Sequence, residues 1–193
     1  MRLFIAINFN DATRSRLVSL RDELHKASSR GRFTHPENLH LTLAFLGECN
    51  EQQTTFVMTA MNTTSFKPFE LSIDRIGRFK RSGSDIFSSF ASQNPPPAAR
   101  LLSGTWWAGV CENKVLLELQ QNLTDRLWKN GLECDKRKYS PHITLGHEII
   151  TQAQPRQIEP FGEMVTCIEL MKSERIGGKL TYTTIHAVKA EVK

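Results

Sequence analysis

The chain carries one short strand pattern twice, and this repeat constrains the fold more than any other feature. The stretch NLHLTLAFLG contains His40 and Thr42, and the stretch YSPHITLG contains His142 and Thr144, so the two histidines stand 102 positions apart. A single copy is most often a histidine bonded to a backbone carbonyl at a sheet edge. Two copies at this distance are typical of a duplicated supersecondary unit rather than of a solenoid repeat.

The two faces of each strand differ in character. Successive side chains of a strand alternate between its faces, so Ala44 is expected beside His40 and Thr42, and Phe45 is expected on the buried face with Leu41. The second copy divides in the same way, into His142, Thr144 and Gly146 on one face and Ile143 and Leu145 on the other. Each strand is therefore predicted to present an imidazole and a hydroxyl on one side and to fill a core with the other.

The elements around the two strands also repeat in order. The first half predicts a strand over 2–9, a helix over 11–28 beginning at Asp11, a loop over 29–38 before the histidine strand, a helix over 50–64 and a strand over 69–79. The second half predicts a strand over 105–111, a helix over 113–131 and a hairpin over 165–192, whose IELMKSERIGG echoes FELSIDRIGRF of the first half. The sequence indicates an α+β fold built from a duplicated β-α-β unit.

The two halves are expected at 1–85 and 105–193, within one domain spanning 1–193. Between them, residues 86–104 contain three consecutive prolines. Proline fixes the backbone and removes an N–H donor, so this segment is predicted to be an inserted, exposed loop.

The charge favours polyanionic partners. A net charge of +5 and a sequence pI near 9.2 attract phosphate backbones, although many solvated surfaces are as basic. Three basic clusters lie at 77–83, 135–138 and 172–179. The first interleaves Phe79 with cations, including Lys80 and Arg81, so an aromatic ring and positive charges could contact a nucleotide together.

Cysteine usage and hydropathy indicate the compartment. The four cysteines are scattered without metal-ligand spacing, as is usual for free thiols in a reducing environment. No run of 18 apolar residues occurs, and the apolar start MRLFIAINF is too short for a membrane span. The sequence predicts a cytoplasmic protein without a membrane segment.

Two histidines and two threonines across one cleft would suit phosphoryl transfer. Histidine gives and takes protons near neutral pH, so one imidazole can act as a base and the other as an acid. Threonine hydroxyls donate to phosphate oxygens. Neither motif has an acidic cluster for Mg²⁺, and two histidines are too few for a zinc site. We therefore expect no metal and no cofactor.

The stretches NLHLTLAFLGE and KRKYSPHITLG, with RLFIAINF and IGRFKRSGSD, closely resemble the two-histidine (2H) phosphoesterases, above all their bacterial LigT-like branch. The resemblance covers nearly the whole chain. It implies a bilobal, pseudo-twofold α+β fold, in which two antiparallel sheets flank a central cleft and helices cover the outer faces. It also implies a monomer that acts on RNA ending in a 2',3'-cyclic phosphate, such as a tRNA half or a short oligonucleotide.

The implied reaction is metal-independent hydrolysis of the cyclic phosphate to a 2'-phosphomonoester, with a reversible, ATP-independent 2'-5' ligase activity in some members. The resemblance implies that His40 is the acid and His142 the base, and that Thr42 and Thr144 hold the phosphate. Many relatives have arginine where this chain has His147. A neutral imidazole would stabilise less charge, so lower or acid-shifted activity is one expectation and a solvent-facing side chain is the other.

Several points stay open from the sequence. A base-stacking aromatic is expected from among Phe4, Phe9 and Phe79. The alternatives for function are the same chemistry on small cyclic nucleotides or 2'-5' oligonucleotides, or an RNA-binding module without catalysis.

Overall fold

The computed structural model describes residues 1–80, 102–132 and 138–191. These ranges form strands, three α-helices and one short 3-10 turn. The strands are β1 (Arg2–Asn8), β2 (Ser28–Phe33), β3 (His40–Glu48), β4 (Phe69–Lys80), β5 (Leu102–Val110), β6 (His142–Thr151), β7 (Arg156–Val165), β8 (Cys167–Ile176) and β9 (Lys179–Lys189). The helices are α1 (Asp11–Lys26), α2 (Glu51–Asn62) and α3 (Lys114–Lys129), and the 3-10 turn η1 (Pro36–Asn38) precedes β3.

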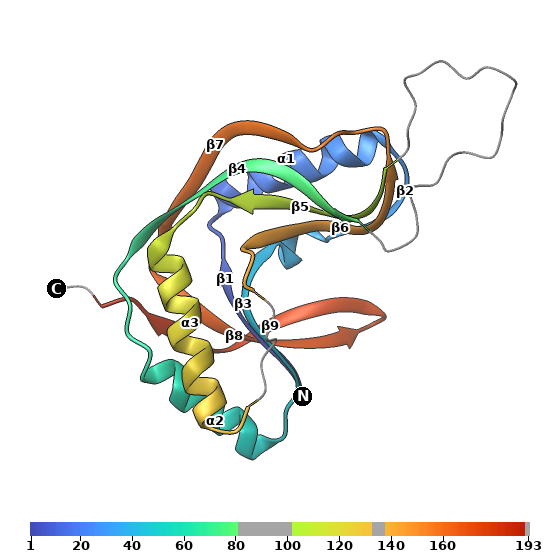
Figure 1. The fold of residues 1–193 in the computed structure, drawn as a ribbon. Coiled ribbons are helices and arrows are strands. Elements are labelled where there is room, and N and C mark those ends of the chain that lie inside the picture. Colours follow the sequence, from blue (N-terminus) through green and yellow to red (C-terminus); the bar gives the residue numbers. More distant parts are fainter. Residues whose placement is uncertain (81–101, 133–137, 192–193) are drawn as a thin grey trace, which may run out of the picture.

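The strands form one nine-stranded antiparallel sheet, and its two parts are joined only by the short β3–β6 pairing. Their order is β7-β4-β5-β6-β3-β1-β8-β9, and β2 pairs with the free side of β6. Strands β3 and β6 share a single register pair, Leu41 with Ile143. We call the sheet of β7, β4, β5, β6 and β2 the upper lobe and the sheet of β3, β1, β8 and β9 the lower lobe, as they stand in Figure 1. The predicted α+β fold with antiparallel strands is confirmed, and the β3–β6 pairing joins the two expected sheets into one.

Each lobe takes elements from both halves of the sequence. Strand β4 of the first half pairs with β5 of the second, and β8 of the second half pairs with β1 of the first. Helix α1 packs against β2, β6 and β7 of the upper lobe, whereas α3 packs against α2 and β3 of the lower lobe. Figure 1 shows α1 along the upper sheet and the α2–α3 pair beside the lower one. The two halves are therefore interlocked rather than side by side.

The helices begin where side chains cap them. Asn10, rather than the expected Asp11, accepts from the amide of Thr13 and starts α1. Asn50 and Gln53 form a reciprocal capping box at α2. The apolar stripe of α3 faces the core as predicted, with Leu116, Leu119, Leu123 and Leu127 buried. No helix in the described ranges has the length and apolar character needed to cross a membrane.

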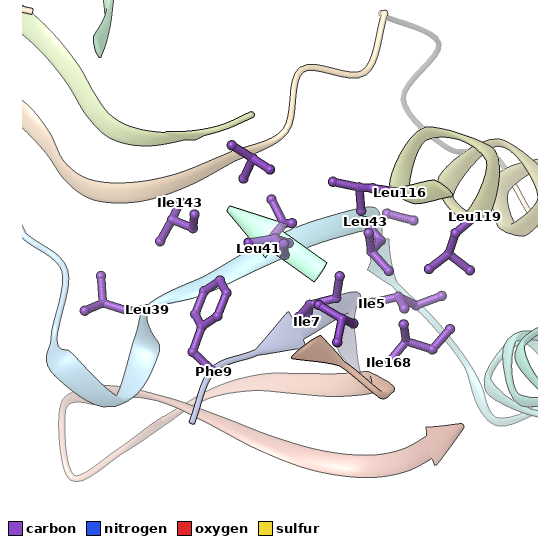
Figure 2. Packing of buried hydrophobic residues seen from close by; sticks show 14 of the residues in the cluster. Ile5, Ile7, Phe9, Leu39, Leu41, Leu43, Leu116, Leu119, Ile143 and Ile168 are labelled. Carbon is purple, nitrogen blue, oxygen red and sulfur yellow. The ribbon is translucent and has the colours of Figure 1, made fainter. Parts of the chain in front are cut away.

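One continuous core runs from the lower lobe to the junction between the lobes. Leu41 and Ile143, the only residues paired between β3 and β6, have 0% of their surface exposed. Figure 2 shows both among buried leucines and isoleucines from β1, β3, α3 and β8. Because the apolar faces of β3 and β6 pack into this core, their polar faces are both directed away from it.

Three segments differ from the sequence-based expectation. Residues 28–33, expected as helix end and loop, form β2, because their backbone completes the outer edge of β6. Strand β7 over 156–165 was not expected, since its side chains are mostly exposed and give no apolar alternation. Strand β5 begins at Leu102 rather than at residue 105, so residues 102–104, assigned to the proline-rich loop, belong to the sheet. The rest of that loop lies outside the described residues.

Candidate active site

The junction of the lobes brings the two repeated motifs together. His40 and Thr42 flank Leu41, and His142 and Thr144 flank Ile143. Since Leu41 and Ile143 are paired and buried, the residues on either side of them emerge on the opposite, open face of the two strands. All four polar side chains line one cavity of about 540 Å³, which we call the central cavity.

Both imidazoles are held in the same way. His40 Nδ1 lies 2.8 Å from the carbonyl oxygen of Asn38, and His142 Nδ1 lies 2.7 Å from that of Ser140. A carbonyl only accepts, so Nδ1 carries the proton in each ring and the neutral ring has its lone pair on Nε2. His40 Nε2 lies 3.0 Å from Thr42 Oγ1, whose hydroxyl donates to it when the ring is neutral. This tautomer leaves Nε2 of each ring as the atom that exchanges protons.

Aromatic rings on neighbouring strands position each imidazole. Phe4 lies 4.8 Å from His40 between ring centroids, and Tyr182 meets the same imidazole edge-on at 5.3 Å. Phe79 meets His142 edge-on at 5.0 Å. Phe4 lines the central cavity but has only 4% of its surface exposed, so it packs mainly behind His40. Its contact with a substrate stays a prediction.

Burial sets the charge state of His40. Removal of the ring from water lowers the pKa of His40, and a positive charge on His142 lowers it further, whereas the hydrogen bond to the Asn38 carbonyl acts in the opposite direction. The net pKa of His40 lies below its ordinary value. His40 is therefore mainly neutral in the free protein at neutral pH, and it gives up a proton readily once protonated.

A bulge in each histidine strand brings another side chain into the central cavity. In β3, Thr42 pairs with Ala6 and Ala44 with Ile5, which leaves Leu43 as the extra residue. Alternation is shifted from this point, so Phe45 is 46% exposed and lines the cavity. The expectation that Phe45 faces the core was wrong, because strict alternation does not hold across a bulge.

The second strand has its bulge at the equivalent position. Trp107 pairs with Thr144 and Trp106 with Gly146, so Leu145 is the extra residue and His147 lines the cavity. Phe45 and His147 are thus the fifth residues after the two motif histidines. In the second motif, His147 occupies the position that corresponds to Phe45 in the first. A polar side chain at this position was the signal in the sequence that the position faces the cavity.

His147 lies at the rim rather than within the pair. Its Nδ1 is 3.3 Å from Thr105 Oγ1, and its side chain is exposed. Partial burial lowers the pKa of His147, as do the positive charges of Arg32 and His142, while Glu148 opposes them. His147 is therefore mainly uncharged at neutral pH, although it faces the same cavity as His40.

A second cavity of about 440 Å³, the side cavity, adjoins the central one. It shares Thr42, Phe45 and His142 with the central cavity. Its other lining residues come from β3, β4, α3 and the segment before β6: Leu43, Ala44, Phe79, Gln120, Thr124, Lys138, Tyr139 and Ser140. The Tyr139 hydroxyl donates to the carbonyl of Thr42 at 2.9 Å, and burial raises the pKa of Tyr139. This bond ties the segment before β6 to β3.

The other predicted contact residues lie elsewhere. Lys80 is the exposed last residue of β4 and does not line either of these cavities. Arg81 lies outside the described residues. Among residues 1–80, 102–132 and 138–191, no three His, Cys, Asp or Glu side chains are grouped so that they could hold a metal ion.

Comparison with known proteins agrees with this geometry. Residues 7–85 match the family model described as LigT like Phosphoesterase. The RNA 2',3'-cyclic phosphodiesterase of Archaeoglobus fulgidus is 30% identical over 170 residues, which cover 85% of each chain. The protein of that name from Escherichia coli K12 is 28% identical over 188 residues, covering 95% of this chain and 93% of that one.

Solved structures show the same fold. The crystal structure of E. coli LigT complexed with 3'-AMP superposes with a TM-score of 0.78 at 23% sequence identity, over 98% of this chain and 97% of that one. The apo form of E. coli LigT gives a TM-score of 0.75 over 98% and 96%. The solved structures show the shared fold, and the family model together with the A. fulgidus relative establishes that this chain belongs to the LigT-like family of 2H phosphoesterases.

Proposed function

We propose that this protein is an RNA 2',3'-cyclic phosphodiesterase, which opens a terminal cyclic phosphate to a 2'-phosphomonoester. The observation that carries the proposal is the convergence of His40, Thr42, His142 and Thr144 on the central cavity. Relatives that cover most of the chain have this activity as their name. The proposed substrate is the end of a tRNA half or a short oligonucleotide, and a monomer is sufficient, since one chain supplies all four side chains.

The reaction needs one proton removed and one delivered. His142 Nε2 takes a proton from water, whose oxygen forms a new bond to phosphorus while the bond from phosphorus to the 3' oxygen breaks. His40 Nε2 delivers a proton to the departing 3' oxygen. The hydroxyls of Thr42 and Thr144 donate to the non-bridging oxygens, where negative charge grows. The same steps with an RNA 5' hydroxyl in place of water would form a 2'-5' linkage, and their reversal would cleave that linkage to a cyclic phosphate.

The environment of His40 supports its role as the acid. An anionic phosphate in the cavity favours the protonated ring, and the buried ring then releases the proton readily as the 3' oxygen departs. Its Nδ1 bond to Asn38 keeps the ring in place through both states.

The proposed pair predicts the shape of the pH dependence. One imidazole must be protonated and the other neutral, so kcat/KM is expected to be bell-shaped, and one limb is expected below the ordinary histidine value of about 6.5 because the pKa of His40 is lowered. Steady-state rates from pH 4.5 to 9 measure this limb. The control variant is His147→Gln, which removes the other imidazole in the cavity whose pKa is lowered. The same limb is expected in the pH profile of this variant. A profile without a limb below this value would contradict the participation of His40.

The test of the function uses a short RNA with a 2',3'-cyclic phosphate end, incubated with the protein in excess EDTA. We expect a 2'-phosphate product, resolved from the 3'-phosphate by chromatography, because histidine and threonine side chains supply every proposed contact. If the protein turns over only cyclic mononucleotides or 2'-5' oligonucleotides, these compounds are its substrates instead of RNA with a cyclic phosphate end. Binding of RNA without turnover of any of them would favour the non-catalytic alternative.

A further inference from the structure

One end of the central cavity is rich in cationic side chains that the proposed reaction does not use. Arg2 and Arg175 line the cavity together with three imidazoles. Among the residues that the structure describes, the lining of this cavity includes no carboxylate. The electrostatic character of the cavity therefore favours more than one negative charge.

The sheet places the two arginines side by side. Arg2 of β1 pairs with Ser173 of β8, and Arg175 follows two residues later on the same face of β8. The guanidinium carbon of Arg2 lies 5.2 Å from the ring centroid of Phe45. The exposed side chain of Arg2 thus reaches along the strand to Phe45, at the side of the cavity that the motif residues line.

Neither guanidinium is neutralised by a carboxylate within the described part of the chain. Glu48, the register partner of Arg2, instead pairs with the amino group of Met1 at 3.6 Å. Arg175 donates one N–H, from Nη1, to the carbonyl of Gly178 at 2.9 Å and so stays near the β8–β9 turn. The remaining N–H donors of both guanidinium groups are available to a ligand. Paired N–H donors of a guanidinium match the oxygens of a phosphate.

The distance along the sheet between Thr42 and Phe45, the residue that Arg2 contacts, fits the spacing of phosphates in a nucleic acid. Phe45 pairs with Phe4, and Thr42 pairs with Ala6, so two residues of β1 separate the level of Phe45 from that of Thr42. Two strand residues span about 6.6 Å, which is close to the separation of consecutive phosphates along an RNA strand. With one phosphate at the threonines, the next one along the chain would reach Arg2.

We propose that Arg2 and Arg175 form a second phosphate site, which binds the phosphate on the 5' side of the terminal nucleoside. This inference rests on the proposed function, and it names the substrate class as RNA chains rather than mononucleoside cyclic phosphates. It places the contact with the RNA backbone on the lower lobe, away from Lys80 at the end of β4.

Two substrates test the site directly. One is a nucleoside 2',3'-cyclic phosphate without a 5' phosphate, and the other is the dinucleotide that carries the same nucleoside at its cyclic end. We expect the native protein to turn over the dinucleotide with a kcat/KM at least about tenfold higher. Because one further phosphate is neutralised, this advantage should shrink by about threefold between roughly 50 and 200 mM salt.

Arg2→Gln and Arg175→Gln isolate the contribution of the site. Each is expected to lower kcat/KM for the dinucleotide by about three- to tenfold, mostly through KM, and to leave the rate on the mononucleoside unchanged. Both side chains are exposed, so these variants should fold normally. Arg126→Gln, which removes an exposed arginine of α3 that lines neither cavity, is the matched control and should change neither rate. Equal loss on both substrates, or no loss on either, would overturn the second site.

Calorimetry separates this inference from the proposed function. If the native protein hydrolyses neither substrate, the proposed function fails, and titration with a nucleoside 3',5'-bisphosphate and with the 3'-monophosphate still tests the site. Tighter binding of the bisphosphate in the native protein, with the difference lost in Arg2→Gln, would support it. Equal affinities for the two ligands would refute it.

Discussion

Alanine at His40 or at His142 is expected to lower kcat for cyclic phosphate hydrolysis by about 10²–10⁴-fold, because each substitution removes one proton transfer. The two imidazoles lie in one cavity and act in the same step. The double variant should therefore lose much less than the product of the single losses. Rates on the dinucleotide under substrate saturation measure the effect, and unchanged circular dichroism shows that the fold is retained.

A substrate with sulfur in place of the 3' bridging oxygen assigns the two roles. A thiolate leaves without a proton, so it needs no acid. We expect His40→Ala to recover at least about tenfold of its loss on the sulfur substrate, whereas His142→Ala, which lacks the base, should recover little. The opposite pattern would exchange the roles, and recovery in neither variant would contradict acid–base catalysis by this pair.

Valine at Thr42 or Thr144 is expected to lower kcat by about 10²–10³-fold, the usual loss when a donor to developing negative charge is removed. Valine keeps the shape of threonine but cannot donate. Thr42→Ser and Thr144→Ser restore the hydroxyl and should restore most of the activity. Losses confined to KM would mean that the hydroxyls bind the ground state and the transition state equally.

The two threonines should differ in one respect. Thr42 Oγ1 is within hydrogen-bond distance of His40 Nε2, and the described contacts give Thr144 no such bond to His142. Thr42→Val should therefore shift the limb of the pH profile that belongs to His40, and Thr144→Val should leave this limb in place.

Alternation and motif spacing were sufficient to predict much of the fold and the core of the site. The buried faces of the histidine strands before their bulges and the stripe of α3 follow from local periodicity, and the convergence of the four motif residues follows from the repeat of the motif. The assignment of those four residues to catalysis remains a prediction until the variants are measured.

What the sequence could not indicate depends on contacts between distant segments. Phe45 faces the cavity because of a bulge, which is a property of the pairing between β3 and β1. Strands β2 and β7 form because β6 and β4 offer edges for backbone hydrogen bonds, for which their own side chains give little signal. Arg2 and Arg175 are 173 positions apart in the chain, and only the β1–β8 pairing brings them together.

The interlocked halves have a consequence for synthesis on the ribosome. Strand β1 is synthesised long before its partner β8, residues Cys167–Ile176, because most of the other strands and all three helices lie between them in the chain. Until then one edge of β1 has no native partner in the sheet, so a nascent chain exposes unpaired backbone donors and acceptors in an apolar strand. The lower lobe can close only after β8 and β9 have been translated, and the central cavity is completed at that stage.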